Sequence, residues 1–364
     1  MADRYAEGLA ASSAIVVATA ALASVLTAWA IRYAHRRRLY DLPGQRRSHD
    51  APTPRGGGIA IVVAMIAGGL ALAVRDGAVQ HLALLLPPVL GIAGVGWLDD
   101  HGGLSAPKRL AMHVLAAAWV FAGPLFVLAA IPLAGAAGTA GTHVFALVAG
   151  AGVTFALAWS INLHNFMDGI DGLLVLQAMF VLVVLAALTA VHGVQGSALL
   201  LACAAACAGF APFNFPRARI FMGDVGSGVL GFVIGVAVLW QVAHPRIAAT
   251  SGLVLCSAFV TDATCTLVSR MLGGRRWYSA HREHLYQWLV RAGFSHARVV
   301  ALYMGWNLLV ALPVVGWMNH APTSPMRFGL APAIAVYALA SVAWWAGKRW
   351  CLRRVRERSA HAAA

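Results

Sequence analysis

Acidic residues are scarce in this 364-residue chain. It holds only 13 Asp and Glu against 27 Lys and Arg, and charged residues make up 11% of it. An average soluble domain carries about a quarter charged residues. Hydrophobic residues make up 60%. So little charge cannot cover the surface of an ordinary soluble protein, and the composition excludes that class.

Cysteines and long polar segments are also few. The five cysteines are scattered, and Cys203 and Cys207, which share one face of an expected helix, have no His or carboxylate beside them. They are expected to pack rather than bind a metal or form a disulfide. The longest stretches between apolar runs, about 33–56 and 270–297, are too short to bury a core. One transmembrane catalytic domain over 1–364 is therefore expected.

Long apolar runs recur along the whole chain. Each has about twenty residues, enough to cross roughly 30 Å of hydrocarbon as a helix. The first run lacks a positively charged segment before it and is expected to be a retained helix rather than a signal peptide. The pattern predicts an all-α, polytopic membrane protein with about eleven spans, near 12–31, 57–74, 80–98, 110–131, 142–162, 173–191, 197–213, 227–243, 249–269, 298–317 and 327–346.

Basic residues gather on one predicted side of the membrane. If the N-terminus lies outside and the spans alternate, 23 of the 27 Lys and Arg fall on the inner side, which includes a basic tail over 347–364. The other side holds only Arg4, Arg75, Arg246 and Arg327. By the positive-inside rule, the basic face is cytoplasmic. The net charge of +14 thus indicates contact with anionic membrane lipid and no nucleic-acid partner.

Five of the thirteen acidic residues lie in three short polar patches between the apolar runs, namely Asp99, Asp100, Asp168, Asp171 and Asp224. Carboxylates are costly beside hydrocarbon, so membrane proteins keep them where they line an aqueous cavity or bind something. Neighbouring carboxylates and Asn oxygens suit a hard cation such as Mg²⁺. All three patches fall on the predicted cytoplasmic side. They predict a metal–phosphate active site at that membrane face.

Two of these patches show spacing or glycine patterns that suggest how their residues are used. Asn165, Asp168 and Asp171 repeat at intervals of three, so even a loose helical turn would set them on one side. The Gly-rich segment 221–228 opens an expected helix, and its backbone N–H groups would suit a phosphate. Phe221 either packs at the interface or offers a stacking surface for a base.

A late loop carries His281-Arg282-Glu283-His284. The spacing of its histidines does not match that of a zinc protease. Arg282 disfavours a divalent cation there and suits a phosphate or sugar-phosphate. A histidine protonated near neutral pH would donate to the same anion. Asp262, a lone carboxylate inside a predicted span, is either functional or paired with Arg270 or a neighbouring loop.

From about Asp41 to Gln287 the chain resembles the polyprenyl-phosphate N-acetylhexosamine-1-phosphate transferases, also called membrane glycosyltransferase family 4. The resemblance rests on Asp99-Asp100, on Asn165-x-x-Asp168-Gly-x-Asp171-Gly-Leu173, and on Asn214 ten residues before the Asp of Met-Gly-Asp224-Val-Gly-Ser. Segment 280–287 resembles the branch that starts bacterial O-antigen and related surface polysaccharides. It departs from the corresponding loops of the peptidoglycan-precursor translocase and the enterobacterial common-antigen enzyme.

The resemblance implies that a UDP-N-acetylhexosamine and undecaprenyl phosphate react, with Mg²⁺ or Mn²⁺, at the cytoplasmic face of the bacterial inner membrane. The products are UMP and undecaprenyl-diphosphate-sugar. Family members also imply a possible homodimer. The implied metal ligands are Asp224 and Asn165. The implied catalytic residues are Asp99 (the base or orienting group for the lipid phosphate), Asp100 and Asp168, the last also at the nucleotide pocket. The implied nucleotide- and sugar-binding residues are Asp171, Asn214, Phe221, His281, Arg282 and His284.

Two alternatives are a peptidoglycan-precursor phospho-sugar transferase of the same superfamily and an ion-coupled secondary transporter. Transporter sites tend to lie near the bilayer midplane between repeated halves. Here the carboxylates cluster at one face, and the sequence shows no internal repeat. The identity of the sugar, and whether transfer takes one step or a covalent intermediate, stay open.

Overall fold

The computed structural model describes residues 2–42, 51–122, 139–276, 281–320 and 329–363. In this part of the chain the regular structure is helical apart from a two-stranded antiparallel ribbon, which the all-α prediction did not include. The ribbon pairs β1 (Tyr40–Asp41) with β2 (Thr53–Pro54). The helices are α1 (Ala2–Arg37), α2 (Gly58–Arg75), α3 (Val79–Gly102), α4 (Ala106–Ala122), α6 (Thr139–Phe166), α7 (Leu173–Val191), α8 (Ser197–Asn214), α9 (Gly223–Val242), α10 (Ser251–Leu255), α11 (Ser257–Leu272), α12 (Leu285–Arg291), α13 (His296–Trp306), the π-helical turn η1 (Asn307–Ala311), α14 (Leu312–His320) and α15 (Ala331–Ala363).

Eight helical segments of the described chain are long and apolar enough to cross a membrane. They belong to α1, α2, α3, α6, α7, α8, α9 and the continuous α13–η1–α14 segment. Large apolar side chains on their outer surfaces are exposed, as at Val191 (80%) and Leu309 (79%), which lipid tolerates and water does not. The chain is thus a multi-pass membrane protein. The count of about eleven spans stays a prediction, because α4 and α11 have only 17 and 16 residues and part of the predicted span 110–131 lies outside the described residues.

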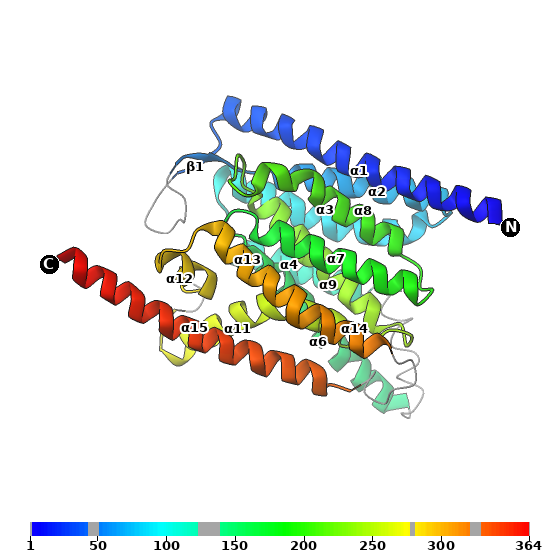
Figure 1. Ribbon diagram of the computed structural model, residues 1–364. Helices are drawn as coiled ribbons and strands as arrows, with labels where there is room; N and C mark the ends of the chain where they lie inside the picture. The colour runs from blue at the N-terminus through cyan, green and yellow to red at the C-terminus, as the bar shows by residue number, and fades with distance from the viewer. Residues whose placement is uncertain (1, 43–50, 123–138, 277–280, 321–328, 364) are drawn as a thin grey trace.

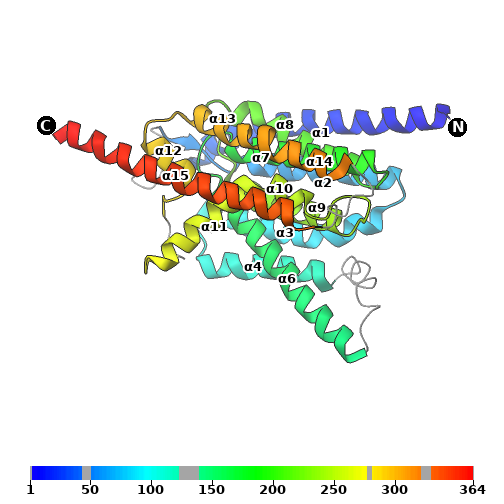
Figure 2. The ribbon, with the colours of Figure 1, turned by 60° about the horizontal axis from the view of Figure 1, so that its bottom comes forward.

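The helices run side by side in a bundle (Figure 1). α1 packs along α8 and α2, α7 along α8, and α6 along α9. α6 tilts away from the other helices and extends below them with α4 (Figure 2). Glycines in α9 allow close approach: an added Cβ at Gly226 would overlap Met222, and one at Gly231 would press on the Ser160 carbonyl at 2.7 Å. Small residues at helix contacts are typical of membrane bundles.

The three polar patches and the late loop meet at one end of this bundle. The C-terminal ends of α3, α6 and α8 lie there with the start of α9, the β1–β2 ribbon and α12 (Figure 1). Backbone hydrogen bonds fasten the segment after β2 to the start of α9. Phe221 N donates to Pro54 O at 2.8 Å, and Gly58 N donates to Met222 O at 2.7 Å. Residues far apart in the sequence are thereby gathered around one site.

The predicted basic tail continues the helix of the preceding span. α15 runs unbroken for 33 residues from Ala331 to Ala363. Its C-terminal part projects past the bundle at the end that holds the polar patches (Figure 1). The basic residues after position 347 are therefore carried on a rigid helical extension.

Candidate active site

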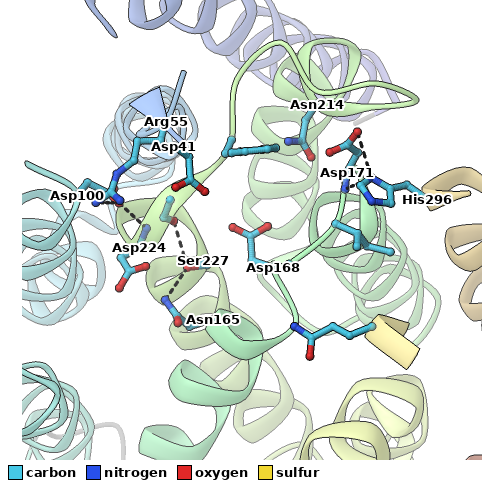
Figure 3. Close-up of a pocket in the computed structure, with 15 residues that line it drawn as sticks. Asp41, Arg55, Asp100, Asn165, Asp168, Asp171, Asn214, Asp224, Ser227 and His296 are labelled. Carbon is cyan, nitrogen blue, oxygen red and sulfur yellow. Dashed lines mark hydrogen bonds and ion pairs between the residues drawn. The ribbon is translucent and has the colours of Figure 1, made fainter. Parts of the chain in front are cut away.

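A cavity of about 240 Å³ lies where the polar patches meet. Seven sequence-predicted residues line it: Asp100, Asn165, Asp168, Asp171, Asn214, Phe221 and Asp224. The other lining residues are Asp41, Arg55, Gly169, Ile170, Gly223, Ser227, Gln287 and His296. Figure 3 shows these side chains arranged around a common space, with the carboxylate of Asp168 pointing into it. Asp99 lies beside the cavity, whereas His281, Arg282 and His284 are not among its lining residues.

Asp100 holds the first turn of α9. Its carboxylate accepts hydrogen bonds from the backbone N–H groups of Asp224 (3.2 Å) and Val225 (3.4 Å), and it lies 3.4 Å from the Arg55 guanidinium. An anion is favoured at a helix N-terminus. Gly223 has φ +76°, and an added Cβ would lie 2.8 Å from Asp100 Oδ1. The amides expected to bind a phosphate are thus already bonded to Asp100, which fixes the turn that presents Asp224.

Arg109, at the start of α4, bridges two of the predicted acidic residues. Its Nη1 atom lies 2.8 Å from Asp99 Oδ2 and 2.6 Å from Asp224 Oδ2. Asp99 also accepts a hydrogen bond from the backbone N–H of Leu104. One cation therefore separates two carboxylates that would otherwise repel each other. Nothing in the sequence pattern distinguishes Arg109 from the ordinary basic flank of a span.

Asp168 sits in the short loop between α6 and α7 with its carboxylate toward the cavity. Burial raises the pKa of Asp168 well above its usual value, and the nearby Asp224, Asp100 and Asp171 raise it further. Among the described residues, none donates a hydrogen bond to this carboxylate. A carboxylate in that position needs a proton or a cation to offset its charge. The arrangement favours a chemical role over a structural one.

Asp171 and Asn214 hold the neighbouring loop in place. Asp171 Oδ2 accepts a hydrogen bond from Ala218 N at 3.1 Å and lies 3.2 Å from His296 Nδ1. Asn214 accepts from Gly172 N at 3.0 Å and donates to Ile220 O at 3.0 Å. These contacts set the position of segment 215–221, including Phe221 at the cavity wall. Nucleotide binding by these residues stays a prediction.

Asn165 is tied to the same turn as Asp224. Its Nδ2 donates to Ser227 Oγ at 3.0 Å, and that hydroxyl donates to Gly223 O at 3.1 Å. In the described chain, no three His, Cys, Asp or Glu side chains form a ready metal-binding group. Mg²⁺ usually takes one or two protein carboxylates and completes its shell with water and substrate phosphates. The carboxylate and amide oxygens of Asp224, Asp168 and Asn165 fit such an ion.

The His281–His284 loop forms a separate cluster. His284 is 3% exposed and begins α12, with its Nδ1 3.8 Å from Asp262 Oδ1. Burial lowers the pKa of His281 to about 4, helped by His284 and Arg270, and burial also lowers the pKa of His284. These lowered pKa values favour neutral rings at pH 7, and a neutral imidazole still has one N–H that could donate to an anion. Whether Arg282 or the histidines contact substrate stays a prediction.

Asp262 is not paired with Arg270. That arginine pairs instead with Glu283, which also pairs with Arg275 at 2.7 Å. Asp262 accepts hydrogen bonds from the backbone of the late loop, at Leu285 N (2.7 Å) and Tyr286 N (3.3 Å). Of the two bonding partners predicted for Asp262, the neighbouring loop is confirmed and Arg270 is wrong.

Several residues that line the cavity were not predicted from the sequence. Asp41 ends β1, Arg55 follows β2, Ser227 is in α9, Gln287 is in the first turn of α12, and His296 begins α13. For Arg55 and Ser227 the signal was their place inside or beside the Gly-rich motifs. His296 carried no signal, because only the packing of α13 brings it to Asp171.

The fold and the site together place a cluster of acidic residues at one end of a membrane-embedded helical bundle. Residues 81–242 match the model of glycosyl transferase family 4. A decaprenyl-phosphate N-acetylglucosaminephosphotransferase of Mycolicibacterium smegmatis is 30% identical over 355 residues, covering 89% of this chain and 86% of the relative. The chain belongs to glycosyl transferase family 4.

Two further relatives widen the comparison. An undecaprenyl-phosphate alpha-N-acetylglucosaminyl 1-phosphate transferase of Yersinia pestis is 27% identical, with 76% of this chain and 77% of the relative covered. A phospho-N-acetylmuramoyl-pentapeptide-transferase of Deinococcus radiodurans is 33% identical, with 50% and 59% covered.

Proposed function

We propose that this protein transfers N-acetylhexosamine-1-phosphate from a UDP-sugar to undecaprenyl phosphate and releases UMP. The observation that carries the proposal is the cavity at the bundle end, which Asp168, Asp224 and Arg55 line and beside which Arg109 pairs with Asp224. A water-soluble donor and a lipid acceptor can meet only at such a membrane boundary. The names of the relatives, which act on polyprenyl phosphates, support the acceptor.

The reaction brings two anions together. An oxygen of the lipid phosphate attacks the β-phosphorus of the UDP-sugar, and the bond from that phosphorus to the UMP oxygen breaks. Positioning and electrostatic stabilisation supply most of the catalysis in such transfers. Mg²⁺ held by Asp224, Asn165 and Asp168 would offset the negative charge of the diphosphate and of the leaving UMP.

The chain's own residues then have distinct tasks. Asp99 orients the lipid phosphate or accepts its proton, and Asp100 fixes the turn carrying Asp224 through two backbone hydrogen bonds. Arg109, bonded to both Asp99 and Asp224, supplies positive charge next to the reacting phosphates. Phe221 offers its ring to the uracil, and Asp171 and Asn214 shape that side of the pocket.

The relatives named for N-acetylglucosamine favour UDP-N-acetylglucosamine as donor. The resemblance of segment 280–287 supports a role in starting O-antigen or related envelope polysaccharides. The Deinococcus relative keeps transfer of phospho-N-acetylmuramoyl-pentapeptide as the second candidate. Family membership, and carboxylates gathered at one bundle end, oppose the ion-coupled transporter.

The decisive assay incubates the purified protein with undecaprenyl phosphate, Mg²⁺ and a panel of UDP-sugars while UMP is followed. UDP-N-acetylglucosamine and UDP-N-acetylgalactosamine test the proposal, and UDP-N-acetylmuramoyl-pentapeptide tests the second candidate. Reactions without lipid, and with Asp168→Asn, are the controls. Lipid-dependent UMP release supports the proposal, and release with the pentapeptide donor alone would replace it. Release with none of the donors would overturn both.

We further propose that the cavity opens to the cytoplasm at the bacterial inner membrane. The 23-to-4 basic asymmetry supports this orientation. Single cysteines at positions in 99–109, 214–226 and 281–297, in a cysteine-free background, are expected to react with a membrane-impermeant reagent only after the membrane is opened. Labelling of any of them in intact cells would contradict the orientation.

A further inference from the structure

Asp262 is the most heavily bonded acidic side chain in the described structure outside the cavity. It lies in α11, is 2% exposed, and accepts hydrogen bonds from three other helices and from its own. The donors are Leu285 N (2.7 Å), Tyr286 N (3.3 Å), Tyr303 Oη (2.7 Å), Trp344 Nε1 (2.9 Å) and Thr266 Oγ1 (3.2 Å). A buried carboxylate satisfied by this many donors is held in one place.

Two of these donors are the first backbone amides of α12. A carboxylate at a helix N-terminus satisfies otherwise unpaired N–H groups and interacts well with the helix dipole. His284 N also donates to the Gln287 side chain at 3.3 Å, which closes the same turn. Asp262 therefore fixes the position and direction of α12 at its start.

The fixed turn carries Tyr286 onto the loop that holds Asp168. Tyr286 is 1% exposed, and its hydroxyl donates to the backbone carbonyl of Phe166 at 2.9 Å. The same hydroxyl packs against Gly169 so tightly that a Cβ there would overlap it. Gln287, the next residue of the turn, lines the cavity. Phe166 and Gly169 flank Asp168, so Tyr286 contacts the chain on both sides of that carboxylate.

We propose that Asp262 and Tyr286 are positioning residues that hold the 166–169 loop so that the Asp168 carboxylate faces the cavity. The order of contacts is Asp262 to the start of α12, Tyr286 to Phe166 and Gly169, and that loop to Asp168. The expected effect of these residues on catalysis rests on the proposed transferase function. The contacts between α12 and the 166–169 loop are independent of that function.

The test compares the full-length wild type with Tyr286→Phe and Asp262→Asn in detergent. Tyr286→Phe removes one hydroxyl and keeps the buried ring. The matched control is Tyr337→Phe, which removes the same kind of hydrogen bond, from Tyr337 Oη to Leu253 O (2.8 Å), between α15 and α10. Hydrogen exchange of backbone amides 165–172, the melting temperature and the kcat and KM for UMP release are measured for each protein.

Tyr286→Phe is expected to speed exchange at 166–169 by about tenfold, the order of magnitude for one lost buried hydrogen bond. The kcat is expected to fall by about tenfold, and exchange in α7 and α10 to stay unchanged. Asp262→Asn is expected to have a larger effect on the same amides and on 284–287. Tyr337→Phe is expected to leave exchange at 165–172 and kcat within about twofold of wild type.

Unchanged exchange at 165–172 in Tyr286→Phe would overturn the proposal, as would faster exchange throughout the protein with a melting temperature lowered as in Tyr337→Phe. Should Asp262→Asn fail to fold, Tyr286→Phe still decides. Should the wild type release no UMP, the proposed function fails, and the exchange data alone decide the link between α12 and the loop.

Discussion

The acidic residues that line the cavity and Asp262 lie near the same end of the bundle, and they differ in how their charges are balanced. Asp262 accepts five hydrogen bonds from backbone and side-chain donors. Asp168 accepts none from the described residues, and its neighbours are themselves acidic. The fold therefore supplies hydrogen-bond donors to the charge of Asp262, whereas the charge of Asp168 needs a proton, a cation or a ligand to offset it.

Asp100 shows that carboxylates lining the same cavity can differ in how many hydrogen-bond donors the fold supplies to them. It lines the cavity, yet it accepts two α9 amides and lies beside Arg55. Its bonding resembles that of Asp262 more than that of Asp168. Burial alone thus does not identify a catalytic carboxylate, whereas the number of donors that the fold supplies to it is informative.

The largest expected effect is that of Asp224→Asn. Removing a charged ligand of the proposed Mg²⁺ should lower kcat for UMP release by about a thousandfold or more, and it should not lower the melting temperature because it also relieves repulsion within the acidic group. Asp76→Asn, at an exposed acid paired with Arg75 at the C-terminal end of α2, is the control. Turnover close to wild type at limiting Mg²⁺ would remove Asp224 from the metal site.

Arg109→Ala comes next. It removes the cation between Asp99 and Asp224 and should lower kcat/KM by about a hundredfold, because the two half-buried carboxylates then repel each other and the reacting phosphates lose a stabilising charge. Lys108→Ala removes the same charge from the exposed neighbouring position and should leave kcat/KM within about twofold. Equal losses in the two variants would mean that net charge, not the bridge, matters.

Arg282→Ala tests whether the His281–His284 loop contacts the substrate. If its guanidinium binds the sugar-phosphate, the KM for the UDP-sugar should rise by about tenfold while the Mg²⁺ concentration needed for half-maximal rate stays the same. Steady-state kinetics at several Mg²⁺ concentrations separate the two parameters. A change in the Mg²⁺ requirement alone would assign the loop to the cation site, and unchanged kinetics would leave it a purely structural element.

The smallest expected effect concerns the histidines of that loop. Burial lowers the pKa of His281 to about 4, below the unfolded value of about 6.5. As the pH falls from about 6.5 toward 4, the unfolded chain binds a proton that the folded protein does not, so the free energy of unfolding decreases. Thermal melts of His281→Gln should therefore show a shallower loss of stability than wild type over this range, and the two should agree above pH 7. Parallel curves would show that His281 is not buried in its neutral form.

Much of the fold could be predicted because membrane helices are encoded locally. An apolar run of about twenty residues is sufficient to predict a spanning helix, and the helices at 173–191 and 197–214 begin and end within a residue of the predicted runs. The continuation of α15 through the basic segment was missed, because charge ends a membrane span without ending a helix. The β1–β2 ribbon was missed because two-residue strands have no periodic signal.

The same reasoning applies to the site. The polar groups at the membrane boundary could be read from the chain, because Asp and Asn beside apolar runs are rare and their spacing is visible. Six such residues line one cavity. Their partners depend on packing: Arg109 bridges Asp99 and Asp224, Asp100 binds the start of α9, His296 meets Asp171, and Asp262 anchors α12. Hydrogen bonds and desolvation act over a few ångströms between side chains from different helices, and those distances are set by packing.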